Sequence, residues 1–283
     1  MAFDIAFGVA GNMTGHLEQA GEAGDFVAVS APEHAPKGLF PTWVRGADGA
    51  LGVDPFSAST IALPDLTLPV QTEPEVGLRV ELQWAGRELT RVRATGFAAY
   101  NDVSLRIPAP KISRKKNWGP RTKGLSGTVL PLADGLVEGC SLDRYRLVSL
   151  LVRRGAVHVY GEDSAVLGYS YFHQRLMRWV LDRLRNQAAQ GPLEDLGQWL
   201  AVAGRPERAL VGIGATRYTD FGATTMLQPG DETVVVVYDG EVHTPEQVRV
   251  AVGRGDDASL TASVLRQQVV CEVQPYAPTP RSE

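Results

Sequence analysis

Alternating hydrophobic and polar residues predict β-strands along much of the chain. In "VGLRVELQW" (76–84), every second residue from Val76 to Leu82 is a large aliphatic, the period-two pattern of a strand with one buried face. A second alternating run, 92–106, follows the turn "AGREL", and the segment 144–161 predicts a further hairpin across Arg154-Gly155. The runs "ALVGIGATR", "ETVVVVYDGE" and "QQVVCEVQP" predict strands in the last third of the chain.

Helical periodicity is confined to short parts of the sequence. Residues 169–188 carry apolar side chains at three- and four-residue spacing and predict one clear helix, and 192–203 predicts a second, shorter one. The segments 31–70 and 107–128 contain many proline and turn residues and predict extended pieces and loop. Many strands with few helices predict a β-rich α+β fold whose sheet curls or closes.

Composition and charge narrow the classes of partner. The net charge of −4 offers no general attraction for nucleic acid or an anionic membrane, and no apolar run approaches the roughly 20 residues of a membrane span. Cys140 and Cys271 lie far apart, which fits two reduced thiols. The start "MAFDIAFGVAGN" lacks the basic region of a signal peptide. We therefore expect a cytoplasmic protein with neither nucleic acid nor membrane as partner.

Three acidic residues are the first candidates for chemistry. Glu73 and Glu75 are two residues apart at the start of a predicted strand, so their side chains share one face. Asp102 ends the next predicted strand, where antiparallel pairing would bring it beside them. Three converging carboxylates suit a hard cation such as Mg²⁺ or Mn²⁺. From spacing alone, solvated edge acids and a turn cap explain the same residues.

Basic residues supply the next candidates. Arg106 and Lys123 follow the acidic cluster, and a cation beside a metal-bound oxyanion stabilises developing negative charge. The stretch "KISRKKNWGPRTK" (111–123) otherwise reads as a solvated basic loop, in which we expect Lys115 and Lys116 to face water. His16 lies in the glycine-rich segment 11–24, the kind of segment that forms a mobile lid.

The order of these motifs resembles the fumarylacetoacetate hydrolase (FAH) family. The matching pieces are "GVAGNMTGHLEQ", "EPEVGLRV", "YNDVSLR", "WGPRTKG", "GATRYTDFG" and "LQPGDE", in that order along the chain. The resemblance implies a mixed β-roll of the FAH C-terminal domain type. It also implies a division into an N-terminal lid and extended segment (1–70), a metal-binding catalytic domain (71–275) and a flexible tail (276–283).

The resemblance also implies roles for individual residues. It makes Glu73, Glu75 and Asp102 ligands of Mg²⁺ or Mn²⁺, and His16 and Lys123 catalytic residues. Arg106, Ser104 and Thr216 would bind a small anionic 2-oxo acid. The resemblance also implies that the protein is a homodimer. The implied reaction is hydrolysis of a C–C bond in an acylpyruvate or 1,3-dicarbonyl compound.

One departure from the family pattern concerns the residue that would pair with the histidine. The family has a glutamate three residues after the histidine, and this chain has Gln19, which carries no charge. Glu22 or Glu33 would then have to supply the carboxylate. We also expect His16 to lie away from the metal in the free protein and to close over it when substrate binds. Two alternatives stay open: a metal-dependent decarboxylase, hydratase or isomerase acting through an enolate, and a catalytically degenerate ligand-binding protein.

Overall fold

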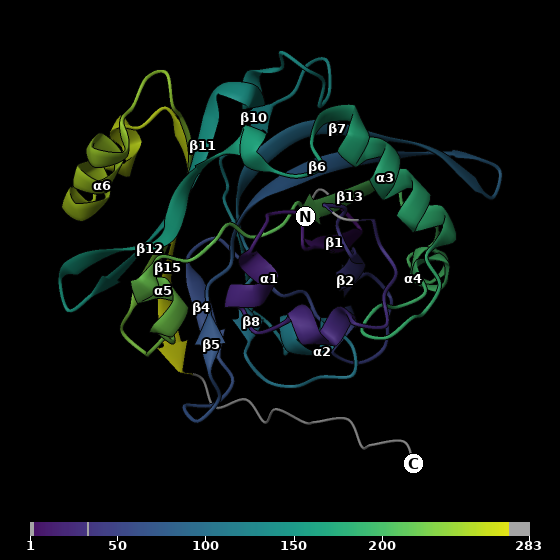
Figure 1. Cartoon of the computed structure of the whole chain (residues 1–283), viewed down its shortest axis with the longest axis horizontal. Helices are drawn as coiled ribbons and strands as arrows, with labels where there is room; N and C mark the ends of the chain where they lie inside the picture. The colour runs from purple at the N-terminus through teal and green to yellow at the C-terminus, as the bar shows by residue number, and fades with distance from the viewer. Residues whose placement is uncertain (1–2, 33, 272–283) are drawn as a thin grey trace.

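The computed structural model describes residues 3–32 and 34–271, in which most strands belong to two curled sheets (Figure 1). The larger sheet contains, in spatial order, β2 (Gly38–Val44), β1 (Ile5–Ala10), β13 (Arg208–Gly212), β6 (Pro74–Ala85), β7 (Glu88–Asn101), β9 (Lys123–Leu125) and β3 (Phe56–Ser57), with β10 (Leu130–Pro131) also paired to β7. The smaller sheet contains β12 (Ala156–Ala165), β11 (Tyr145–Arg153), β14 (Glu232–Asp239), β15 (Ala262–Cys271) and β4 (Thr60–Leu63). The short strands β5 (Val70–Gln71) and β8 (Ser104–Leu105) pair with each other.

The helices are short and lie around the sheets. They are α1 (His16–Gln19), α2 (Ser113–Lys116), α3 (His173–Asn186), α4 (Leu196–Val202), α5 (Asp220–Thr224) and α6 (Pro245–Arg254), with single 3₁₀ turns at Ala23–Phe26, Ala50–Gly52, Ser141–Arg144, Val166–Gly168 and Asp257–Ser259. Figure 1 shows α3 and α4 on one side of the molecule, α6 on the opposite side, and α1, α2 and β8 between them. The β-rich α+β class with few helices is confirmed. None of the described helices is long and apolar enough to cross a membrane.

The core explains why α3 forms where the sequence predicts it. Its buried residues Leu176, Met177, Val180 and Leu184 form one stripe, which joins the main hydrophobic cluster under β6 and β7. The helix begins at His173, because Phe172 at its N-cap is still extended. The predicted hairpin between β11 and β12 is also present, and its turn residues Arg154 and Gly155 both have positive φ.

Two sequence-based assignments differ from the structure. The segment 107–128 is not all loop, because it contains α2 and β9, and β9 pairs with β7 and β3. Helix α6 was not predicted, although its ends have clear signals. Thr244 and Gln247 form a capping box, proline occupies the first turn, and Gly255 ends the helix in the left-handed conformation.

The predicted division of the chain stays a prediction. Strands β1 and β2, from the first 70 residues, share the larger sheet with β6 and β13 from the predicted catalytic part. The predicted tail, 276–283, lies outside the described residues.

Hairpin β6–β7 determines where the acidic residues lie. Its two strands pair from the turn at Gly86-Arg87 back to Pro74 and Asn101. Beyond that last pair, the backbone N–H of Asp102 donates to the carbonyl of Glu73 at 2.9 Å. The open end of the hairpin therefore holds one acidic residue from each strand side by side.

Candidate metal centre

Three carboxylates converge at the open end of the β6–β7 hairpin. Oxygen atoms of Glu73, Glu75 and Asp102 all lie within 4.8 Å of one another, and all three side chains are buried. The structure confirms the expectation that these three side chains lie close together. Buried carboxylates repel one another unless cations or protons compensate them, so this site must contain cations, bound protons or both.

Buried side chains of the protein itself supply that charge. Lys116 Nζ lies 2.5 Å from Glu73 Oε2 and 2.8 Å from Asp102 Oδ2. Arg106 lies 2.8 Å from the other oxygen of Glu73, and Lys123 Nζ lies 3.2 Å from Asp102 Oδ1. Both oxygens of Glu73 and both oxygens of Asp102 thus face a cationic side chain.

The protonation of the acidic residues follows from these contacts. Burial raises the pKa of Glu73, but Lys116 and Arg106 outweigh that effect and hold the pKa far below its usual range. Glu75 has no such partner, and burial together with Asp102 and Glu73 raises its pKa well above the usual value. The backbone N–H of Gly214 donates a hydrogen bond to Oε2 of Glu75, with a distance of 3.0 Å between the nitrogen and the oxygen. The raised pKa favours the protonated form of Glu75 in the absence of an added cation.

The donor set fits a small divalent ion. Three carboxylates supply the hard oxygen ligands that Mg²⁺ and Mn²⁺ prefer, and the burial of Glu75 next to Asp102 and Glu73, which raises its pKa, favours a cation at this corner of the cluster. The adjoining cavity has a volume of about 20 Å³ and is lined by His16, Glu73, Glu75 and Lys116 among others. That space holds about one water molecule.

Lys115 and Lys116 are buried, so the expectation that they face water is wrong. They are 3% and 2% exposed. Lys115 Nζ contacts Glu22 and Asp25, each at 3.0 Å, whereas Lys116 enters the carboxylate cluster. Both lie on α2, and both side chains point inward because they pair with acidic residues there. Sequence reasoning missed Lys116, whose signal was the unusual basicity of 111–123.

Lys123 lies beneath the cluster, at the start of β9. Its ammonium donates to the backbone carbonyl of Val103, pairs with Asp102 and lies 5.7 Å from the centre of the Trp118 ring. Burial lowers the pKa of Lys123 to about 8, although Asp102 opposes the shift. A buried lysine with a pKa near neutrality is able to give or take a proton.

His16 covers the carboxylate cluster instead of pointing away from it, so that expectation is wrong. It begins α1, is buried, and lines the small cavity together with Glu73 and Glu75. Its ring lies 5.4 Å from that of Tyr218, and Nδ1 has no hydrogen-bond partner among the described residues. Burial lowers the pKa of His16, which leaves the imidazole neutral.

Gln19 holds the segment around α1 next to the carboxylate cluster. Its Oε1 accepts from the backbone N–H of Tyr218 at 2.9 Å, and its Nε2 donates to the carbonyl of the same residue at 3.2 Å. A carboxylate could accept the first hydrogen bond but could not donate the second. The glutamine at this position therefore fastens the segment to the loop after β13, and it contributes no charge to His16.

Glu22 lies near His16 but is engaged elsewhere. Its Oε1 is 2.8 Å from Arg106 and 3.0 Å from Lys115. Burial and Glu73 raise the pKa of Glu22, yet Arg106 and the two lysines of α2 outweigh them and lower it. Within the described part of the chain, no hydrogen bond joins Glu22 to His16. Glu33, the other predicted partner, lies outside the described residues.

The predicted substrate-binding residues are at different distances from the cluster. Arg106 lies within it, and its guanidinium also donates to Gln71 and Tyr218, each at 2.6 Å. Thr216 is buried next to β6, where its backbone N–H donates to the carbonyl of Pro74 at 3.3 Å and its hydroxyl has no described partner. Ser104 lies on β8, with its hydroxyl 3.5 Å from a neighbouring carbonyl. Their roles stay predictions.

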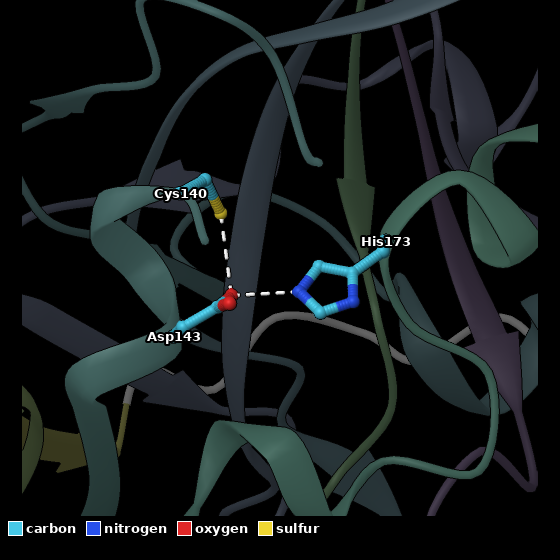
Figure 2. A group of neighbouring side chains, drawn as sticks. All are labelled: Cys140, Asp143 and His173. Atoms are coloured by element: carbon cyan, nitrogen blue, oxygen red, sulfur yellow. Dashed lines mark hydrogen bonds and ion pairs between the residues drawn. The ribbon is translucent and has the colours of Figure 1, made fainter. Parts of the chain in front are cut away.

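Two other features lie outside this cluster. A groove of about 560 Å³ between the β6–β7 turn and helices α3 and α4 contains none of the predicted site residues. A second group of possible metal ligands, Cys140, Asp143 and His173, is shown in Figure 2. Asp143 accepts from the thiol at 3.4 Å and lies 2.7 Å from His173 Nε2, while its other oxygen accepts from the N–H of Gly139. These bonds join a 3₁₀ turn to the start of α3 and account for the group structurally.

Comparisons with known proteins agree on the fold. A family model described as "Family of unknown function (DUF5718)" matches residues 22–269. No curated protein matches the sequence. Among solved structures, Cg1458 with inhibitor has a TM-score of 0.57 at 14% identity, over 95% of this chain and 77% of that one. A putative fumarylacetoacetate isomerase/hydrolase from Oleispira antarctica has a TM-score of 0.54 at 12% identity, over 95% of both chains.

A third similar structure contains ligands. It is 2-keto-3-deoxy-D-arabinonate dehydratase complexed with magnesium and 2,5-dioxopentanoate, with a TM-score of 0.53 at 13% identity, over 97% of this chain and 75% of that one. Identities this low show the fold alone. This chain therefore shares the fold of these proteins, which confirms the fold expected from the sequence motifs.

Proposed function

We propose that this chain, which belongs to the DUF5718 family, is a divalent-metal-dependent enzyme that processes small 2-oxo acids. The observation that carries the proposal is the convergence of Glu73, Glu75 and Asp102 in a buried cluster beside His16 and Lys123. The similar dehydratase, which was solved with magnesium and a 2-oxo compound, supports the same assignment.

The protein's own residues would divide the work. A bound Mg²⁺ would act as a Lewis acid toward the 2-oxo group and carboxylate of the substrate. Arg106 and Lys123 keep positive charge next to the cluster, where negative charge develops on the substrate. His16, neutral and with Nδ1 unpaired, is placed to move a proton. The segment around α1, held to Tyr218 by Gln19, lines one side of the cavity and would limit the entry of bulk water.

The geometry favours an enolate reaction, such as dehydration, decarboxylation or isomerisation. These reactions need one group that moves a proton, and His16 suffices for that. Hydrolysis of a C–C bond also needs an activated water, and Glu22, which lines the same cavity as His16, is held by Arg106 and Lys115. C–C hydrolysis is the second candidate, favoured by the unpaired Nδ1 of His16, which could receive a proton from water.

The test is turnover of a panel of 2-oxo acids and acylpyruvates with Mg²⁺ or Mn²⁺ and then with chelator. We expect metal-dependent consumption of at least one compound. His16→Ala should stop the reaction, and Glu22→Gln should spare an enolate reaction but stop hydrolysis. Binding of these acids without any turnover would point to a degenerate binding protein. Turnover that chelator does not affect would contradict the proposal. The homodimer and the cytoplasmic location stay predictions.

A further inference from the structure

The carboxylate cluster already holds a cation, and that cation belongs to the chain. Lys116 Nζ lies between Glu73 and Asp102, at 2.5 and 2.8 Å from one oxygen of each. It also lies 3.5 Å from the backbone carbonyl of Asp102 and 5.4 Å from the centre of the Phe40 ring. The ammonium is surrounded by carboxylate and carbonyl oxygens and by the Phe40 ring. It therefore occupies the position between the carboxylates where a metal ion would bind.

The position of Lys116 is fixed by its neighbours along the chain. Three residues earlier, the hydroxyl of Ser113 donates to Glu194. One residue later, the side-chain amide of Asn117 donates to the carbonyls of Thr42 at 2.9 Å and Val53 at 3.1 Å. These contacts hold both ends of α2 against other elements. Lys116 is therefore directed into the cluster by the fold, unlike a surface lysine that happens to lie nearby.

The site has no room for the ammonium and a metal ion together. Beside Lys116, the cavity of about 20 Å³ holds about one water molecule. Mg²⁺ requires a near-octahedral set of oxygen ligands and usually keeps several waters. Glu73 and Asp102, the two carboxylates that face Lys116, are also the ones that converge with Glu75. A lysine and a divalent ion would therefore compete for the same two carboxylates.

We propose that Lys116 is a built-in competitor of the metal, so that its ammonium and a divalent ion occupy the carboxylate cluster in turn. The proposal rests on the proposed function, because it assumes that the cluster is the metal site. In the metal-free protein, the ammonium of Lys116 compensates the negative charge of Glu73 and Asp102. A divalent ion enters the cluster only when this side chain withdraws. The chain therefore binds divalent ions more weakly than the same three carboxylates would without the lysine.

The experiment measures Mn²⁺ binding to the full chain by electron paramagnetic resonance and calorimetry. Lys116→Met removes the ammonium and keeps the length of the side chain. Lys115→Met is the matched control, because it removes the same charge one residue earlier on α2, from a buried lysine that contacts Glu22 and Asp25 but not the cluster. We expect K116M to bind Mn²⁺ at least tenfold more tightly than wild type, and K115M to stay within threefold of wild type.

A measurement on the wild-type protein covers the case in which K116M does not fold. Amine-reactive labelling followed by mass spectrometry reports how protected each lysine is. Saturating Mn²⁺ should increase labelling of Lys116 and leave Lys115 unchanged. Labelling of Lys116 that does not respond to bound Mn²⁺ would overturn the proposal.

The binding outcomes separate this proposal from the proposed function. Equal affinity in wild type and folded K116M overturns the competition and leaves the metal-dependent function standing. Binding to K116M but not to wild type supports the competition and overturns metal dependence of the natural chain. Absence of binding to both overturns both.

Discussion

Replacing Asp102 with asparagine tests the charge balance of the cluster. Asp102 is fully buried, and it pairs with Lys116 at 2.8 Å and Lys123 at 3.2 Å. At an effective dielectric constant of about 20, each contact contributes roughly 5–6 kcal/mol of Coulomb attraction. Desolvation offsets much of this, so that breaking a buried pair costs about 3–5 kcal/mol. We expect Asp102→Asn to lower the free energy of unfolding of the metal-free protein by that amount.

The assay is urea unfolding followed by circular dichroism, combined with a Mn²⁺ titration. The amide also removes a charged ligand, so Mn²⁺ affinity should fall by well over tenfold. Asp25→Asn is the control, because Asp25 pairs with Lys115 but its side chain is 34% exposed, and we expect it to lose no more than about 1 kcal/mol. If D102N unfolds at the same urea concentration as D25N and binds Mn²⁺ like wild type, Asp102 neither balances the lysines nor binds metal.

Three further predictions test other parts of the site. Lys123→Met should reduce turnover by the equivalent of about 2–4 kcal/mol in kinetic assays, with Mn²⁺ binding retained. Burial raises the pKa of Glu194 to about 7, so the folded protein holds a proton there that the unfolded chain releases near 4.5. Wild type should lose up to about 3 kcal/mol of stability from pH 4.5 to 7, and Glu194→Gln should remove that slope in urea titrations across this range. A Cβ on Gly212 would collide with Glu75, so Gly212→Ala should weaken Mn²⁺ binding, whereas Gly24→Ala, with open space around it, should not.

The sequence predicted the carboxylate cluster because it depends on local pattern. Alternation identifies β6 and β7, and the short turn between them sets their register. Once the hairpin is known, Glu73 and Asp102 must meet at its open end. The FAH-type motifs at the same positions gave an independent reason to expect the cluster.

The inward direction of Lys116 could not be predicted in this way. A run of lysine and arginine is usually solvated, because burying an unpaired charge costs several kcal/mol. The exception depends on partners far away in the sequence, since α2 is held by Glu194 on one side and by Thr42 and Val53 on the other. The role of Gln19 was missed for a related reason, because its partner is the backbone of Tyr218.

Charge balance makes Lys116 decisive for how this site works. The carboxylates of the cluster are matched in number by the cations that contact it, the two sets being Glu73, Glu75 and Asp102 against Arg106, Lys116 and Lys123. The ion pairs already place a cationic side chain against each oxygen of Glu73 and of Asp102. A divalent ion added to this set would leave an excess of buried positive charge, which is as costly as an excess of negative charge. Metal entry must therefore remove positive charge from the cluster, and the side chain that bridges Glu73 and Asp102 is Lys116.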